Sequence, residues 1–517
     1  MTANPELTVD QRLETPTWDG GLPSRSVRRR AGVMAVCSSV AVVLYFAWLL
    51  RPSRIGNPYL FGILLMAEVF NVVQALGFWW TCVFTGRRRR PLPPPIAEPD
   101  VDVFIPTYNE QVDVVEATVA ASTALRGARV RVFLLDDGNR DAMKALARRY
   151  GVGYVRRTLH QGAKAGNINH ALGRTSAPFI LVLDCDHVPH PDLLVRTLPL
   201  FGRERVAFVQ TPQYYANAST NTIAAAAWSQ QALFFGPIAR GKAAHDSMFC
   251  CGTNVVFRRT ALDSVGGFPE TSVTEDFELS VQLHEHGWAS EYVPSVLANG
   301  LGPEDLASYV SQQHRWARGC VGAIPSVARS RLPLRQKLQY LLSASYFLSG
   351  WTVMVYLALP VIRIVTGIQP LSGSSADGFL AAFAPYFAFA IATVASVGAG
   401  AYTFAAYSLA TSTFWIHVHA TYRAVLRRPS RFVVTPKQGD VVRQWRPAAP
   451  TLVVLGVLVS AALYGLVRDR TPATLNNVGF LALHVCVLSH GVATAVLPAL
   501  ATPAAVTSSR QNEEVAA

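Results

Sequence analysis

The chain has 517 residues, of which 50% are hydrophobic and 15% are charged, and its mean hydropathy is +0.25. That mean hydropathy is high for a soluble protein of this size, so the composition excludes an ordinary soluble globular protein and indicates membrane-spanning segments. The formal net charge of +13 need not indicate a nucleic-acid partner, because arginines beside anionic lipid account for it more simply.

Six apolar runs are long enough to cross a bilayer. They cover residues 31–50, 59–84, 340–364, 379–402, 450–467 and 475–497. The polar stretch between the second and third runs has about 250 residues, which is enough for one catalytic domain. We therefore expect an α-helical transmembrane bundle of about six spans, with one globular domain inserted after the second span.

The distribution of arginines orients these spans. Four arginines lie within residues 25–30, before the first run, and four more occupy residues 87–90, after the second. The link between the two runs carries only Arg51 and Arg54. By the positive-inside rule, the N-terminus and the central domain face the cytoplasm.

The central domain alternates between strand and helix patterns. Residues 102–106, 130–135 and 179–183 are predicted strands, and a helix is predicted over 112–125. This alternation predicts an α/β domain with a mostly parallel sheet, whose ligands bind at the carboxyl ends of the strands.

Polar residues follow the first two predicted strands. They are Thr107, Tyr108 and Glu110 after the first, and Asp136 and Asp137 after the second. Together they offer a ring face and hydrogen-bond acceptors for a nucleotide base and ribose. The alternative is turn chemistry, because Asp-Gly is an ordinary turn dipeptide.

The third strand ends in two aspartates, Asp184 and Asp186. Alternation along a strand sends both side chains to the same side, so the two carboxylates can share a cation, and their hard oxygens favour Mg²⁺ or Mn²⁺. A capping or turn role is the alternative. His187 is either a further ligand or a packed histidine. Lys164, in a segment with glycines that allow close backbone approach, supplies a charge for phosphate.

Two further motifs lie later in the domain. Glu275 and Asp276 precede an amphipathic helix over 277–286, where they act either as catalytic carboxylates or as favourable acids in a first turn. In the segment 312–316, Arg315 can bind a diphosphate and Trp316 can stack on a sugar. The alternative for this segment is a helix lying at the membrane interface.

As an ordered set, these motifs resemble those of the processive family 2 glycosyltransferases, and bacterial cellulose synthases most of all. The resemblance covers residues 102–437. The matching segments are 106–110, 136–138, 164–167, 184–187, 210–213, 249–253, 274–276 and 312–316.

The resemblance implies a GT-A domain that uses a UDP-sugar, with UDP-glucose and a cellulose-like product as first expectation. It implies inversion at the anomeric carbon, a metal on Asp184 and Asp186, and Asp276 as the base. It further implies an acceptor site formed by Gln312, Trp316, Cys251, Gly252 and Thr253. The other expected partners are the growing glycan, the lipid bilayer of a bacterial inner membrane and accessory secretion subunits.

The segment 404–426 is apolar but interrupted by polar residues, which predicts one helix lying along the cytoplasmic interface. The loop that follows resembles the family's gating loop, with Phe432, Thr435 and Lys437 as its residues. An ordinary basic loop beside the membrane is the alternative. No cyclic-dinucleotide-binding barrel follows the last predicted span, so we expect no regulation through such a barrel in this chain.

The expected domains follow from these elements. They are a cytoplasmic tail (1–30), two spans (31–86), the GT-A domain with an interfacial helix at its end (96–330), two spans (338–402), an interfacial helix with the gating loop (403–449), two spans (450–498) and a disordered tail (499–517). The alternatives to a processive synthase are a transferase that adds one sugar to a lipid, a transporter, and a catalytically inactive scaffold.

Overall fold

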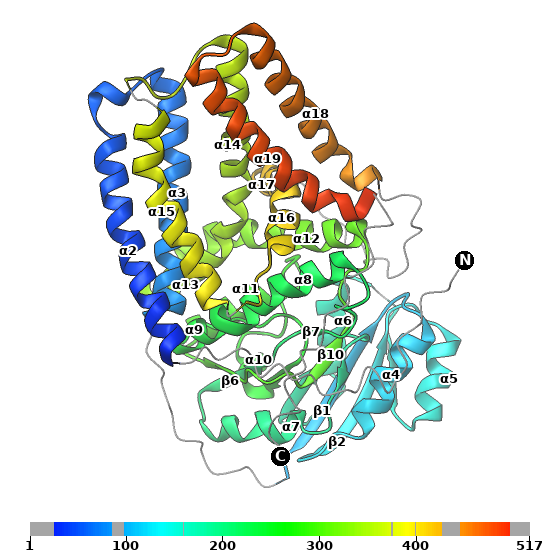
Figure 1. Ribbon diagram of the computed structural model, residues 1–517. Coiled ribbons are helices and arrows are strands. Elements are labelled where there is room, and N and C mark those ends of the chain that lie inside the picture. The colour runs from blue at the N-terminus through cyan, green and yellow to red at the C-terminus, as the bar shows by residue number, and fades with distance from the viewer. Residues whose placement is uncertain are drawn as a thin grey trace, which may run out of the picture.

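The computed structural model describes residues 25–84, 98–158, 160–373, 376–398, 400–426 and 445–496. The expected C-terminal tail and the loop residues Phe432, Thr435 and Lys437 lie outside the described residues, as do residues 1–24 of the expected N-terminal tail, whereas its residues 25–30 belong to α2. In Figure 1 a bundle of long helices stands on a domain built around a β-sheet, and shorter helices lie between the two.

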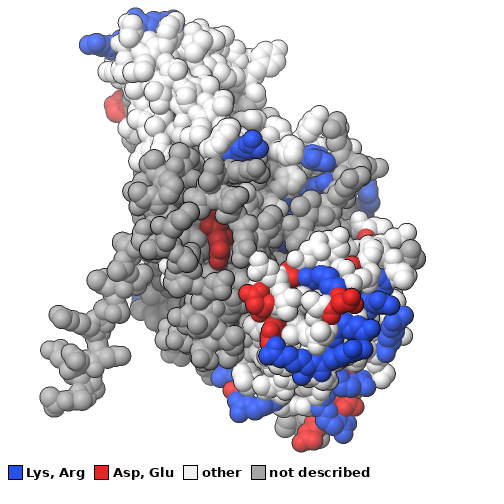
Figure 2. Space-filling model, turned by 90° about the vertical axis from the view of Figure 1, so that its right-hand side faces the viewer, with Lys and Arg blue, Asp and Glu red and all other residues white. Residues whose placement is uncertain are grey.

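Six helical segments of the described chain are long and apolar enough to cross a membrane, as the sequence predicted. They are formed by α2 (Arg25–Leu49), α3 (Pro58–Cys82), α13 (Leu334–Ser345) continued by η4 (Tyr346–Leu348) and α14 (Ser349–Thr366), α15 (Ala376–Val397), α18 (Trp445–Arg468) and α19 (Pro472–Val496). On the face shown in Figure 2, charged side chains crowd the sheet domain, whereas the part of the bundle drawn in white is mostly uncharged away from its outer end. This division suits a bundle surrounded by lipid.

The start of α3 shows why a span begins at this point in the sequence. The Asn57 side chain accepts hydrogen bonds from the backbone N–H groups of Tyr59 and Leu60, at 3.1 Å each. Pro58 occupies the first helical position, where no backbone N–H is needed. The short link before α3 contains the single turn η1 (Pro52–Arg54).

The sheet domain is organised around seven strands in the order β3-β2-β1-β4-β8-β6-β9. Their bounds are β1 (Asp100–Thr107), β2 (Arg129–Asp136), β3 (Gly153–Arg156), β4 (Phe179–Val182), β6 (Val206–Gln210), β8 (Val255–Arg258) and β9 (Ala289–Tyr292). Only β8 runs antiparallel to its two neighbours, β4 and β6. The prediction of a mostly parallel sheet is therefore confirmed, with one reversed strand that the sequence did not indicate.

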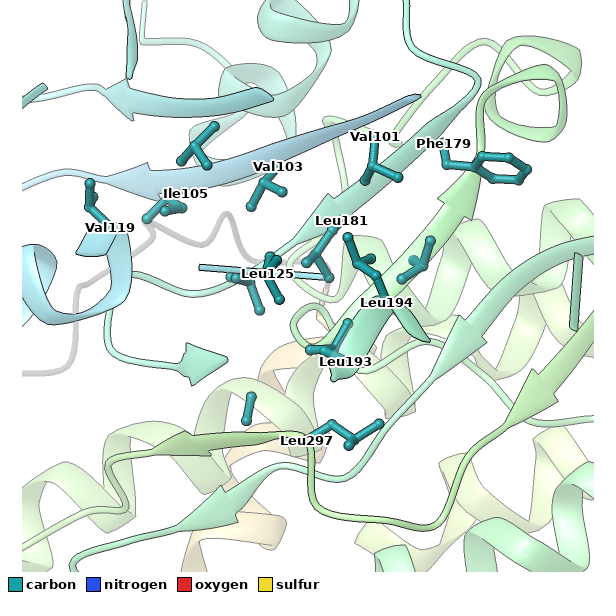
Figure 3. Packing of buried hydrophobic residues seen from close by; sticks show 14 of the residues in the cluster. Val101, Val103, Ile105, Val119, Leu125, Phe179, Leu181, Leu193, Leu194 and Leu297 are labelled. Carbon is teal, nitrogen blue, oxygen red and sulfur yellow. The ribbon is translucent and has the colours of Figure 1, made fainter. Parts of the chain in front are cut away.

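The central strands are apolar because both faces of the sheet are covered. Figure 3 shows one covered face, where Val101, Val103 and Ile105 of β1 pack with Leu181 of β4. The helices nearest this face are α4 (Val112–Thr123), α5 (Asp141–Arg149) and α7 (Leu193–Thr197), the last followed by η2 (Leu198–Gly202). The core fixes the strands, and hence the positions of the polar residues at their ends.

The opposite face packs against α6 (Ala163–Leu172), α10 (Arg259–Ser264) and α11 (Glu275–Glu285). A small second sheet has the order β5-β10-β7, with β5 (Val188–Pro189), β7 (Tyr214–Tyr215) and β10 (Ala298–Gly300). Between the sheets and the bundle lie α8 (Thr222–Leu233), the π-helical turn η3 (Phe234–Ile238), α9 (Ala239–Ala244) and α12 (Leu306–Arg329).

The predicted single helix over 404–426 is wrong in one respect. The segment forms two helices, α16 (Phe404–Ser412) and α17 (Phe414–Val425), which meet at Thr413. The Thr413 hydroxyl donates to the backbone carbonyls of Leu409 and Ala410, at 2.8 and 3.2 Å. Such side-chain bonds compete with the helical pattern, and the backbone of Thr413 leaves the helical region.

The sheet domain and the bundle are joined where α9 meets α3 and α13. A methyl group at Gly241 would lie 2.1 Å from the carbonyl oxygen of Thr81, so only glycine fits this approach. The neighbouring Lys242 is buried, and its ammonium donates to the carbonyl of Gln339 at 2.8 Å. The Gln339 side chain in turn donates to the Thr81 hydroxyl at 2.9 Å. We refer to these four residues as the α9 joint.

Candidate functional site

Three potential metal ligands gather just after β4. Ligand atoms of Asp184, Asp186 and His187 all lie within 4.8 Å of one another. Asp186 and His187 are buried, whereas Asp184 is partly open. The His187 Nδ1 lies 3.3 Å from the Asp186 carboxylate, and its Nε2 is buried with no hydrogen-bond partner among the described residues. Two carboxylates and one imidazole form a donor set that fits a hard divalent cation.

Lys164 connects this cluster to the segment after residue 249. Its ammonium forms an ion pair with Asp184 and donates to the carbonyl of Gly252 at 2.7 Å. Burial lowers the pKa of Lys164, but the carboxylates of Asp184, Glu275 and Asp276 outweigh that effect and leave the pKa raised. Lys164 is therefore a fixed positive charge among the predicted catalytic carboxylates.

The residues after β1 form a local hydrogen-bonded loop. The Thr107 hydroxyl and the backbone N–H of Tyr108 both donate to Oε2 of Glu110, at 2.7 Å each. Arg140 ties this loop to the end of β2, because its guanidinium donates to the Thr107 hydroxyl at 2.8 Å. The Tyr108 side chain is left 45% exposed, which keeps its ring face open to a ligand.

The two aspartates after β2 already have partners. Asp136 is fully buried and accepts from the backbone N–H groups of Gly138 and Arg140, at 3.0 and 2.6 Å, and from the Tyr154 hydroxyl at 2.9 Å. Asp137 forms a two-bond ion pair with buried Arg157, at 2.5 and 2.7 Å. The turn alternative thus accounts for the two backbone hydrogen bonds to Asp136, and the nucleotide-binding role of both aspartates stays a prediction.

Two glutamine side chains form hydrogen bonds with the backbone of the predicted acceptor segment, residues 251–253. The backbone N–H of Cys251 donates to the Gln210 side chain at 2.8 Å, and the Gln213 amide donates to the Cys251 carbonyl at 2.8 Å. Thr253 is buried, and its hydroxyl accepts from the backbone N–H of Asp184 at 2.7 Å. The segment is therefore rigid and directly bonded to the end of β4.

Gly252 sits between Lys164 and Asp276. A methyl group there would lie 3.1 Å from Oδ2 of Asp276 and 3.7 Å from the Lys164 ammonium. Gly252 also has a φ of +80°, in the left-handed region that favours glycine. The sequence placed Asp184 and Asp276 about ninety residues apart, and the structure brings them together around Lys164 and Gly252.

Asp276 lies in the first turn of α11, where the helix dipole favours a carboxylate. Burial and the neighbouring Glu275 nevertheless raise the pKa of Asp276 to about 7. A backbone hydrogen bond from Phe277 and the charges of Lys164 and Arg315 act in the opposite direction. A carboxylate whose pKa lies near neutral pH is suited to accept a proton.

The segment 312–316 lies in the first half of α12, which begins at an Asp305 cap. Gln312 donates to the Tyr215 hydroxyl at 3.3 Å, and Trp316 is partly buried. One turn further, a methyl group at Gly319 would lie 2.2 Å from Cγ2 of Thr274. The helix that carries Arg315 and Trp316 is thus pressed against the residues that begin α11.

Sequence reasoning missed two residues at this site. Arg140 and Arg157 organise the ends of β2 and hold Thr107 and Asp137, but isolated arginines gave no signal in the sequence. It left the role of His187 open, and the structure now places its ring beside Asp186.

A family model described as "Glycosyl transferase family group 2" matches residues 179–402. "Cellulose synthase 1" of Komagataeibacter xylinus is 32% identical over 440 residues, covering 80% of this chain and 28% of the relative. A "Cellulose synthase catalytic subunit [UDP-forming]" of Komagataeibacter sucrofermentans is 31% identical over 473 residues, covering 85% of this chain and 61% of the relative. Another of the same description from Xanthomonas axonopodis pv. citri is 34% identical over 351 residues, covering 63% and 48%. The chain thus spans about a quarter to three fifths of these relatives' own lengths.

Among solved structures, the mannosyltransferase PcManGT from Pyrobaculum calidifontis, in complex with GDP-Man and Mn²⁺, aligns with a TM-score of 0.53 at 18% identity. The alignment covers 72% of this chain and all of that one. This likeness concerns the fold alone, and it confirms the predicted GT-A architecture of the sheet domain.

Proposed function

We propose that this chain, whose residues 179–402 match a family 2 glycosyltransferase model and which is similar in sequence to bacterial cellulose synthases, is a processive membrane synthase. It extends a β-linked polysaccharide from a UDP-sugar, with inversion at the anomeric carbon. UDP-glucose is the first donor to test. The catalytic domain faces the cytoplasm of a bacterial cell, and the product leaves through the bundle. The observation that carries the proposal is the convergence of Asp184, Lys164, Gly252 and Asp276 in one site.

In this proposal, Asp276 takes the proton from the acceptor hydroxyl. Its pKa of about 7 leaves a useful fraction of the carboxylate ionised near neutral pH. The new glycosidic bond forms between the acceptor oxygen and the anomeric carbon of the donor. The bond from that carbon to the UDP oxygen breaks, and the electron pair leaves with UDP. Glu275 supports the reaction indirectly, since its charge raises the pKa of Asp276.

Asp184 and Asp186 would hold Mg²⁺ or Mn²⁺, with His187 beside them. When bound, the cation would supply charge that stabilises a diphosphate leaving group. Lys164 and Arg315 add positive charge from the protein itself. The related fold of PcManGT, whose structure holds Mn²⁺, supports the choice of a divalent cation.

The donor base and ribose lie over the exposed ring of Tyr108, close to Thr107 and Glu110. The acceptor lies over Cys251 and Gly252, with Gln312 and Trp316 from α12 on its other side. A gating loop with Phe432, Thr435 and Lys437 closes over the bound nucleotide. Accessory secretion subunits complete the export route.

Polymerisation can be tested directly on the purified chain. The chain is reconstituted with Mn²⁺ and tested with each of a panel of labelled UDP-sugars in turn. One of these donors should yield a long polymer that a glycosidase can digest. A singly glycosylated lipid as the only product would contradict the processive proposal and favour the single-transfer alternative.

A Trp316→Ala variant sharpens this test. Stacking on the acceptor does not involve the nucleotide, so this variant should lose elongation and keep its affinity for UDP. Loss of UDP affinity together with elongation would show that Trp316 serves the fold of α12 instead.

A further inference from the structure

Four basic side chains gather between α12 and α17. They are His314 and Arg318 on α12, and His419 and Arg423 on α17. Residues four apart share one face of a helix, so each helix presents a histidine and an arginine together. The two faces meet, because Nε2 of His314 lies 3.0 Å from Nδ1 of His419. We call these four residues the basic cluster.

The basic cluster concentrates positive charge in a partly buried place. Burial, together with His419, Arg318 and Arg423, lowers the pKa of His314 to about 4. Burial and the two arginines also lower the pKa of His419. Both imidazoles are therefore neutral near pH 7 and can hydrogen bond to each other, while the arginines carry the charge. Among the described residues, every charged group that acts on this histidine pair is basic.

The two arginines also act on each other. Burial and the charge of Arg423 lower the pKa of Arg318. The Nε group of Arg423 is buried and has no hydrogen-bond partner within the described part of the chain. Like charges repel, and an unpaired buried donor is unfavourable, so an anion between these helices would relieve both costs. Guanidinium groups are geometrically suited to phosphate oxygens.

The basic cluster is open to solvent at His419, and its other three residues are partly buried. Arg318 follows Arg315, the predicted diphosphate ligand, by three residues on α12. The other helix, α17, lies in the chain between the candidate spans α15 and α18. Figure 1 shows α12 where the bundle meets the sheet domain, and α17 packs against both α12 and the bundle helix α14. Phosphate can reach this level from a bound nucleotide or from the headgroup of a membrane lipid.

We propose that the basic cluster binds a phosphate group at the boundary between the sheet domain and the bundle. The site is distinct from the cation site at Asp184 and Asp186. If the phosphate belongs to a nucleotide, the proposal rests on the proposed function. If it belongs to a lipid headgroup, the proposal is independent of that function.

The test compares Arg423→Gln with Arg329→Gln, a control that removes an exposed arginine from the last turn of α12. In the first arm, the purified full-length chain in uncharged detergent is titrated with UDP and Mn²⁺ by calorimetry. In the second, it is placed in nanodiscs that contain phosphatidylcholine alone or with phosphatidylglycerol. Native mass spectrometry then counts the phosphatidylglycerol that stays bound.

Each result decides the proposal. A rise of about tenfold or more in the UDP dissociation constant, for Arg423→Gln only, supports a nucleotide phosphate, since one charged hydrogen bond is worth at least that factor. Unchanged UDP affinity with loss of bound phosphatidylglycerol supports a lipid headgroup. If neither quantity differs between Arg423→Gln and the control, the proposal is wrong and the histidine pair is a packing contact.

A measurement on the wild type keeps the test valid if Arg423→Gln does not fold. Hydrogen exchange of the α17 amides, residues 414–425, should slow when UDP with Mn²⁺ or phosphatidylglycerol is added. Unchanged exchange with both probes would overturn the proposal. If the wild type binds no UDP at all, the proposed function fails, while the phosphatidylglycerol arm still decides the basic cluster.

Discussion

Proton transfer by Asp276 can be tested through the pH dependence of the reaction. Its pKa of about 7, against an ordinary value of 3.8, means that the carboxyl is largely protonated below neutral pH. A base must be ionised to act, so kcat/KM should rise with pH. About one tenth of Asp276 is ionised at pH 6 and about nine tenths at pH 8, so the rate should rise about tenfold between them. With the ordinary pKa, the rate would be flat over this range.

Glu275 provides a perturbation whose sign is fixed by the structure. Its negative charge raises the pKa of Asp276, so Glu275→Gln should move the midpoint of the pH profile to lower pH. The matched control is Glu278→Gln, which removes the same charge within the first turn of α11 but is not among the causes of this shift. The control should leave the midpoint unchanged.

The assay is release of UDP from a labelled donor, measured from pH 5.5 to 8.5 in a constant-ionic-strength buffer. Asp276→Asn should lower the rate by roughly 10² to 10⁴ at pH 8, where the wild-type carboxyl is ionised, while UDP still binds. A flat profile for the wild type, or a midpoint that moves upward in Glu275→Gln, would refute the assignment of Asp276 as the base.

Three further predictions follow from contacts at the site. Asp186→Ala should abolish transfer and weaken Mn²⁺-dependent UDP binding in calorimetry, and full wild-type transfer in the presence of EDTA would contradict the metal proposal. Gly319→Ala should push α12 away from Thr274, which costs about 1–3 kcal/mol in stability and should lower turnover. An unchanged melting temperature and an unchanged turnover would show that the two helices separate freely. Arg157→Met should leave the buried Asp137 without its two-bond partner and with only His160 at 3.7 Å, which costs about 3–5 kcal/mol and lowers the melting temperature. A melting temperature equal to that of the wild type would mean that His160 or water compensates the carboxylate.

The features that could be predicted from the sequence are those with strong local patterns. Long apolar runs gave the six spans because a membrane helix needs about twenty apolar residues. Strands β1, β2 and β4 were predicted because each is an apolar run that ends in polar side chains. The convergence of Asp184 and Asp276 was expected from their motifs, and it brings the end of β4 to the first turn of α11.

Other features depend on contacts between distant residues. Strands β6 and β8 are short apolar runs, and such runs do not reveal which neighbour they pair with or in which direction. The pairing of Asp137 with Arg157 joins residues after two different strands. The break at Thr413 follows from a choice between hydrogen bonds that local composition does not settle.

The α9 joint has a consequence for anyone who wishes to excise the sheet domain as a soluble fragment. Lys242 donates to a carbonyl on α13, and Gly241 leaves space for a carbonyl on α3, so both residues belong to the sheet domain but are completed by the bundle. A fragment cut at the polar boundaries of the sequence would expose these surfaces and lose their partners. Chimaeras that exchange the bundle between relatives face the same constraint, and they would need to carry Thr81 and Gln339 together with α9 as a single inherited unit.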